Sequence, residues 1–265
     1  MPILALLFLH YFIAGGGPVA LPQVTAYPVA DPFVRQLIAE ISGIEPVSQR
    51  VEQVSERLLG RRYLTHPLIG SDTIPERLVT RVDGFDCVTF VETVLAIAYS
   101  GKPDDFTSQL RAIRYHDSRV EWASRLHYAT AWSSNNVARG LLDDLTTGPD
   151  ALTREKLLDR LPGLDPRPSV YRYYPKRSFS AIAPNLLSGD IILFVSGTPG
   201  LDVNHMGIII RRNGMLLLRS ASRRHRAVVD EPLEDYVRRN GMAGFIINRP
   251  VVLSCCRPGR WGEQK

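Results

Sequence analysis

The dipeptide Asn213-Gly214 separates two short apolar runs and is the strongest hairpin signal in the chain. Asn-Gly favours the two-residue turn that joins antiparallel strands, because both residues tolerate positive φ. The pattern therefore predicts strands over residues 206–211 and 215–219. Further β-rich runs extend this hairpin to an antiparallel sheet of about five strands, and they cover residues 190–195, 227–229 and 244–248.

Helical periodicity precedes these strands. Apolar residues recur at helical spacing over residues 31–42 and 48–59, and residues 106–140 are predicted to be helical with irregular loops. Helices followed by antiparallel strands indicate the α+β class. We expect a helical N-terminal extension over residues 31–80, a catalytic domain over residues 81–252 and a tail over residues 253–265.

The first twenty residues contain no Lys, Arg, Asp or Glu. An apolar run from Pro2 to Ala14 precedes a small-residue stretch that ends at Ala20, as in a secretory signal peptide. We therefore predict a signal peptide over residues 1–20 and an exported protein, periplasmic or extracellular, without a stable membrane anchor. The usual positive charge before the apolar run is missing, so a buried apolar segment is the alternative.

The composition is that of an ordinary globular protein, with 45% hydrophobic and 22% charged residues in a chain of 265. The net charge is +5, and much of the excess arginine lies after residue 210. Such a bias suits an anionic partner or a solvated basic face, but no recognition motif for nucleic acid accompanies it. No zinc-type cysteine spacing, phosphate-binding loop or dinucleotide fingerprint occurs, so we expect no metal and no nucleotide cofactor.

The segment Asp86-Cys87 begins a helical pattern of apolar residues. Asp86 is a favourable N-cap whose carboxylate can accept a backbone amide of the first turn. A thiol in that turn lies near the positive end of the helix dipole, which favours the thiolate. Cys87 is therefore a candidate nucleophile, although a small buried cysteine would fit the same position. The other thiols, Cys255 and Cys256, lie in the tail, and we expect Cys87 to remain reduced.

A nucleophilic cysteine needs a base, and histidine is the natural choice at neutral pH. Of the six histidines, His205 opens the strand that leads into the Asn213-Gly214 hairpin. It would therefore lie at the edge of a rigid element. A strand histidine beside the N-terminus of a cysteine helix is an arrangement typical of cysteine peptidases.

Gly84-Phe85-Asp86-Cys87 and His205-x-Gly207 together resemble the NlpC/P60 superfamily of papain-like cell-wall hydrolases. Four stretches resemble one branch of it, the N-acetylmuramoyl-L-alanine amidase-like family, and they are Phe85–Glu92, Ile113–Tyr115, Ser124–Tyr128 and Leu201–Gly207. The resemblance extends over about residues 31–250 and implies a papain-like fold, with the cysteine helix packed on the sheet.

The resemblance implies hydrolysis of the amide between N-acetylmuramic acid and L-alanine in muropeptides or peptidoglycan. Cys87 would attack, His205 would serve as base and then acid, and the Cys87 amide and Tyr63 would hold the oxyanion. Relatives often carry histidine where this chain has Ser220, so we expect Ser220 to orient His205; a water, His225 or an impaired site are the alternatives. Candidate substrate contacts are Arg114, Tyr115, Arg125, Tyr128, Trp132 and Asp202.

Two other functions remain open at this stage. The same catalytic residues would serve an endopeptidase that cleaves within the stem peptide. A wall-binding protein that retained the fold and lost turnover is the second alternative, because Ser220 departs from the pattern of the relatives.

Overall fold

The computed structural model describes residues 31–251 of the chain. Its α-helices are α1 (Pro32–Ile41), α2 (Val47–Arg57), α3 (Cys87–Tyr99), α4 (Phe106–Arg114), α5 (Ala129–Ala138), α6 (Phe179–Ile182) and α7 (Leu233–Arg239). Its strands are β1 (Arg62–Tyr63), β2 (Gly84–Phe85), β3 (Leu142–Asp144), β4 (Leu152–Leu158), β5 (Arg167–Pro175), β6 (Ile191–Val195), β7 (Val203–Arg212), β8 (Met215–Ser222), β9 (Ala227–Pro232) and β10 (Gly244–Pro250). The predicted signal peptide and both tail cysteines lie outside the described residues.

The strands form one sheet in the order β2-β1-β9-β8-β7-β6-β10-β5-β4, with β3 also paired to β10. The pairs are antiparallel except for β1 with β2. The α+β class is confirmed, and β6 to β10 are the five strands expected from the sequence. The expected total of about five is too low, since residues 31–251 contain ten. β1, β2 and β3 have two or three residues each, and β4 carries consecutive charged side chains that hide any apolar alternation.

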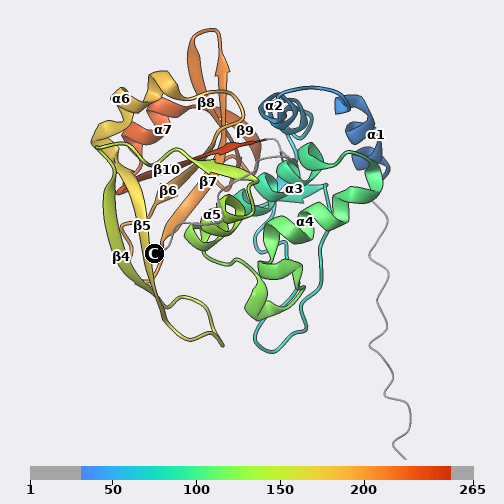
Figure 1. Cartoon of the computed structure of the whole chain (residues 1–265), viewed down its shortest axis with the longest axis horizontal. Coiled ribbons are helices and arrows are strands. Elements are labelled where there is room, and N and C mark those ends of the chain that lie inside the picture. The colour runs from blue at the N-terminus through green and yellow to red at the C-terminus, as the bar shows by residue number, and fades with distance from the viewer. Residues whose placement is uncertain (1–30, 252–265) are drawn as a thin grey trace, which may run out of the picture.

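Helices cover the two faces of this sheet separately. On one face, α1, α2 and α3 share a continuous apolar core with β7 side chains such as Met206 and Ile208. On the other face, Phe179 of α6 and Leu233 of α7 pack with Phe194 and other side chains of the sheet. Figure 1 shows α1 to α4 on one side of the molecule and α6 with α7 on the opposite side. The sheet is thus enclosed between the two helical groups.

The two N-terminal helices are joined to the sheet by a buried arginine. Arg219 of β8 is fully buried and donates to both carboxylate oxygens of Asp230, at 2.7 and 2.8 Å. Its remaining nitrogen donates to Ser55 Oγ, at 3.1 Å, and to the Glu52 carbonyl, at 3.3 Å, both in α2. The region predicted as an N-terminal extension therefore shares its core and a polar contact with the sheet.

No helix in the described part of the chain is long and apolar enough to cross a bilayer.

Candidate active site

Cys87 is the first residue of α3, directly after its N-cap. The Asp86 carboxylate accepts the Thr89 amide at 2.8 Å, and the Thr89 hydroxyl oxygen accepts the Asp86 amide at 3.0 Å. This reciprocal capping box satisfies two amides that a helix start otherwise leaves unpaired, and it confirms the predicted N-cap. β2 leads into the cap, and Tyr63 of β1 lies in register with Phe85. Cys87 is therefore held at a fixed point beside the short β1–β2 pair.

The Cys87 thiol is partly buried, and this desolvation raises its pKa to about 12. The Asp86 carboxylate contributes in the same direction, whereas the backbone amides of Met206, Cys87 and Val88 lower the pKa. The helix start thus supplies amides that stabilise a thiolate, but burial outweighs them. The resting thiol is protonated at neutral pH, so a nearby base must remove the proton when the sulfur attacks.

His205 lies near the start of β7, and its Nε2 is 3.0 Å from the Ser220 hydroxyl of β8. The imidazole stacks on Phe194, with a centroid separation of 6.1 Å and an interplanar angle of 7°, and the Tyr236 ring is 5.6 Å away. Burial lowers the pKa of His205 to about 4, while the Glu231 charge opposes that shift. The imidazole is therefore neutral at physiological pH. If Nε2 donates to Ser220, Nδ1 is the nitrogen that can accept a proton.

Gly207 explains how a residue of β8 reaches this histidine. His205 and Gly207 lie on the same face of β7, because side chains alternate along a strand. A Cβ atom at position 207 would lie 2.9 Å from Ser220 Cβ and 2.7 Å from the Arg219 carbonyl oxygen. The absence of a side chain leaves room for Ser220 beside His205. The glycine of the His205-x-Gly207 pattern therefore serves the contact between the two strands.

The start of β7 brings the predicted catalytic residues into one region. The Cys87 thiol lies beside the amide of Met206, the residue that follows His205. A charge on Cys87 would also raise the pKa of Tyr63 and of Tyr236. The hydroxyl of Tyr63 has no hydrogen-bond partner within residues 31–251, so it is free to donate. The arrangement provides a thiol, a neutral imidazole with a hydroxyl at hydrogen-bond distance, and several donors.

Four of the predicted substrate contacts lie in the protein interior. Arg114 donates to the buried carboxylate of Glu92 at 2.6 Å, and Tyr115 donates to Glu76 at 2.7 Å. Trp132 is fully buried, and the Asp202 carboxylate accepts the amide and the hydroxyl of Thr130 at 2.7 Å each. These side chains are engaged in packing and internal hydrogen bonds.

The other two, Arg125 and Tyr128, line a separate cavity of about 170 Å³ with His127 and Arg167. Arg125 forms a two-pronged ion pair with Glu76, and the Tyr128 hydroxyl accepts the Arg160 amide at 2.8 Å. Both are thus partly engaged within the protein, and neither lines the cavity beside His205.

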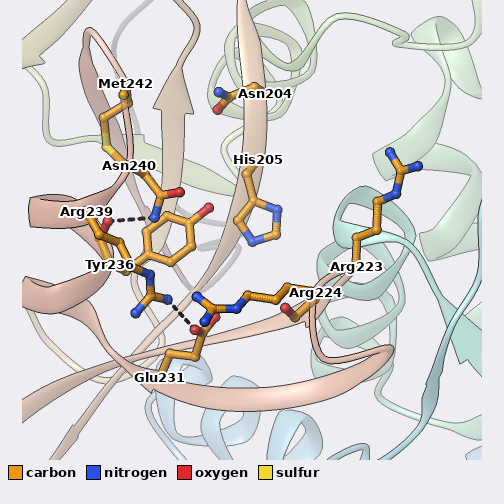
Figure 2. A pocket seen from close by; sticks show the side chains of 11 residues that line it. Asn204, His205, Arg223, Arg224, Glu231, Tyr236, Arg239, Asn240 and Met242 are labelled. Carbon is orange, nitrogen blue, oxygen red and sulfur yellow. Dashed lines mark hydrogen bonds and ion pairs between the residues drawn. The ribbon is translucent and has the colours of Figure 1, made fainter.

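A larger cavity of about 290 Å³ opens beside His205 (Figure 2). Its wall includes residues that the sequence analysis did not single out as site residues: Arg223, Arg224, Glu231, Tyr236 and Arg239. Arginine enrichment after residue 210 was the available signal, but α7, which carries Tyr236 and Arg239, was not predicted. Within the described residues, no group of three or more His, Cys, Asp and Glu side chains could hold a metal ion.

Comparison with known proteins gives a consistent result. A family model described as N-acetylmuramoyl-L-alanine amidase-like matches residues 53–245. The chain is 30% identical to a crystal structure of an N-acetylmuramoyl-L-alanine amidase from Bacteroides uniformis, with a TM-score of 0.69, over 77% of this chain and 98% of that one. A protein from Legionella pneumophila shares the fold at 24% identity, with a TM-score of 0.72, over 83% and 94% of the two chains. No curated protein matches the sequence significantly.

Proposed function

Because the chain belongs to the N-acetylmuramoyl-L-alanine amidase-like family, we propose that it is a cysteine amidase that cleaves the bond between N-acetylmuramic acid and L-alanine in peptidoglycan fragments. The observation that carries the proposal is Cys87 at a capped helix start beside the strand on which His205 contacts Ser220. This placement of a cysteine helix against a histidine strand supports a papain-like site of the NlpC/P60 type. The substrate implies an exported protein that acts in the periplasm or outside the cell.

The first half-reaction forms a thioester. Nδ1 of His205 takes the proton from the Cys87 thiol as the sulfur attacks the lactyl carbonyl carbon of the muramic acid. The tetrahedral intermediate then expels the L-alanine nitrogen, which receives the proton held by His205. The free stem peptide leaves, and the sugar remains bound to Cys87 as a thioester.

The second half-reaction releases the sugar. His205 removes a proton from water, which attacks the thioester carbonyl, and the Cys87 sulfur leaves and is protonated by His205. The products are a free stem peptide with an amino terminus and N-acetylmuramic acid with a carboxylate. Both steps develop negative charge on the carbonyl oxygen. The Cys87 amide and the Tyr63 hydroxyl are the proposed donors to this oxygen, and one such donor is typically worth about 3 kcal/mol in the transition state.

Product analysis tests the bond that is cleaved. Wild-type protein is incubated with a defined muropeptide, and the products are identified by mass spectrometry. We expect an intact stem peptide and an intact sugar. Cleavage within the stem peptide would indicate the endopeptidase, and no cleavage by a folded protein would favour the wall-binding alternative.

Ser220→Ala tests the orienting role of the serine. The change removes the hydroxyl 3.0 Å from His205 Nε2, so the imidazole loses the contact that fixes its orientation and tautomer. We expect kcat to fall about tenfold or more with KM nearly unchanged, since the effect is on the reacting base. Steady-state kinetics on a muropeptide measures it.

Ser133→Ala is the matched control. Ser133 is also a buried serine with a side-chain hydrogen bond, to Asn248 at 2.8 Å, but it lies on α5. The control should keep wild-type kcat at a temperature where both variants are folded. Unchanged turnover in Ser220→Ala would show that Ser220 does not orient His205.

A further inference from the structure

The wall of the cavity beside His205 comes from four parts of the chain, and β7 provides Asn204 and His205. The turn after β8 provides Arg223 and Arg224, β9 provides Glu231, and the end of α7 provides Tyr236 and Arg239. Figure 2 shows His205 beside Tyr236, with Arg224, Arg239 and Glu231 next to them and Arg223 extending away on the other side. The cavity volume of about 290 Å³ is enough for part of a peptide rather than for a single ion.

The charges in this wall are unevenly compensated. The Glu231 carboxylate binds Arg239 and also lies 3.2 Å from His225 Nε2. Arg223 and Arg224 are exposed and have no hydrogen bond or ion pair within residues 31–251. Both arginines line the cavity, and neither has a counter-ion within the described residues; the Arg224 guanidinium lies toward Glu231, whereas that of Arg223 extends away from it (Figure 2). Guanidinium groups pair well with carboxylates, to which they can donate two parallel hydrogen bonds.

The charged side chains of this wall also influence the residues proposed for catalysis. His205 itself lines the cavity, and the Glu231 charge offsets part of the fall that burial causes in the pKa of His205. The Arg223 charge likewise offsets part of the rise that burial causes in the pKa of Tyr63. A charge on Cys87 would raise the pKa of Tyr236, which lies in the same wall. The cationic wall is therefore contiguous with the catalytic region, and a substrate that reaches Cys87 can extend into the cavity.

We propose that Arg223 and Arg224 bind free carboxylates of the stem peptide, so that this cavity holds the leaving-group side of the substrate. The assignment rests on the proposed function. In a muropeptide the N-acetylated sugars are neutral, and the stem peptide contains the free carboxylates. A cavity with two uncompensated guanidinium groups therefore selects the peptide side, and the sugar lies on the other side of Cys87. Arg239, neutralised by Glu231, forms the edge of the cavity.

Peptide binding tests the assignment without requiring turnover. The full chain with Cys87→Ala is titrated calorimetrically with two synthetic stem peptides, one with free carboxylates and one with every carboxylate replaced by a neutral carboxamide. We expect the acidic peptide to bind at least about tenfold more tightly, the effect of one charge-assisted hydrogen bond. Adding Arg223→Ala and Arg224→Ala should remove this difference, by weakening only the acidic peptide.

Arg238→Ala is the matched control, because Arg238 lies on α7, does not line the cavity and pairs with Asp235. It removes one positive charge nearby and should leave the difference between the peptides intact. Equal affinity for both peptides, or an equal loss in the Arg238 variant, would overturn the assignment. Binding of inorganic phosphate as tight as that of the acidic peptide would also overturn it, since the site would then be a general anion site. Cleavage of muropeptides by wild-type protein is scored separately, so a failure of the proposed function is distinguishable.

Discussion

Cys87→Ser is expected to reduce kcat on a muropeptide by at least about 10⁴-fold, the scale seen when a catalytic nucleophile is replaced. Serine retains the size and the helix position of Cys87, so the capping box between Asp86 and Thr89 should be unaffected. A hydroxyl is far less acidic than a thiol, and a neutral imidazole cannot activate it to the same degree. Turnover measured with mass-spectrometric detection, together with a thermal melt, separates loss of chemistry from loss of fold.

The chain provides its own control for this substitution. Cys255 and Cys256 are the remaining cysteines, and the double variant Cys255→Ser/Cys256→Ser keeps Cys87 as the only thiol. That variant should retain wild-type turnover and should react with iodoacetamide at Cys87. If Cys87→Ser retained a tenth or more of the wild-type activity, another nucleophile would have to be sought.

His205→Ala is expected to lower kcat by about 10³-fold, because the protonated thiol then lacks its base. The pKa of about 12 at Cys87 makes this dependence strong, since almost no thiolate exists at neutral pH without proton transfer. Alkylation of Cys87 by iodoacetamide at pH 7 should slow in parallel. Both rates are measured on protein with the two tail cysteines replaced by serine.

His225→Ala is the control variant for His205→Ala. The sequence offered His225 as an alternative to Ser220 beside His205, but in the structure His225 contacts Glu231. It should change kcat by no more than a few-fold. In wild-type protein, protonation of His205 should abolish activity below about pH 4, since the imidazolium cannot accept the thiol proton. A large loss in His225→Ala together with a small loss in His205→Ala would reverse the roles of the two histidines.

The parts of the fold that could be predicted have strong local patterns. β6, β7, β8 and β10 contain apolar runs, and Asn213-Gly214 marks the turn between β7 and β8, where both residues have positive φ. α1 and α2 begin and end within two residues of the predicted ranges, because each has a clear apolar stripe. β4 was not predicted because charged residues occupy its middle and most of it is exposed, and α7 was not predicted because it is only seven residues long.

The candidate site also contains residues that the local sequence indicates and residues that only the fold brings together. The Asp86 cap and the strand position of His205 follow from neighbouring residues, so the sequence indicates them directly. The cavity wall does not, because Arg223, Glu231 and Tyr236 meet only when β8, β9 and α7 are folded together. Arg114 and Trp132 are the opposite case, because the sequence suggested them as substrate contacts and the structure places them in the interior. An arginine and an aromatic residue suit a carboxylate and a sugar, but their chemistry alone does not reveal that both are buried.

The missing side chain at Gly207 matters when activity is inferred for related chains. A Cβ atom there would approach Ser220 and the backbone of β8 closer than 3 Å, so the two strands would have to separate. A homologue could thus retain the cysteine, the histidine and the serine and still be inactive, because one methyl group has displaced the serine from the imidazole. Inspection of the cysteine, histidine and serine positions proposed for catalysis would miss that defect. An inventory of intact enzymes in this family should therefore require glycine two residues after the histidine.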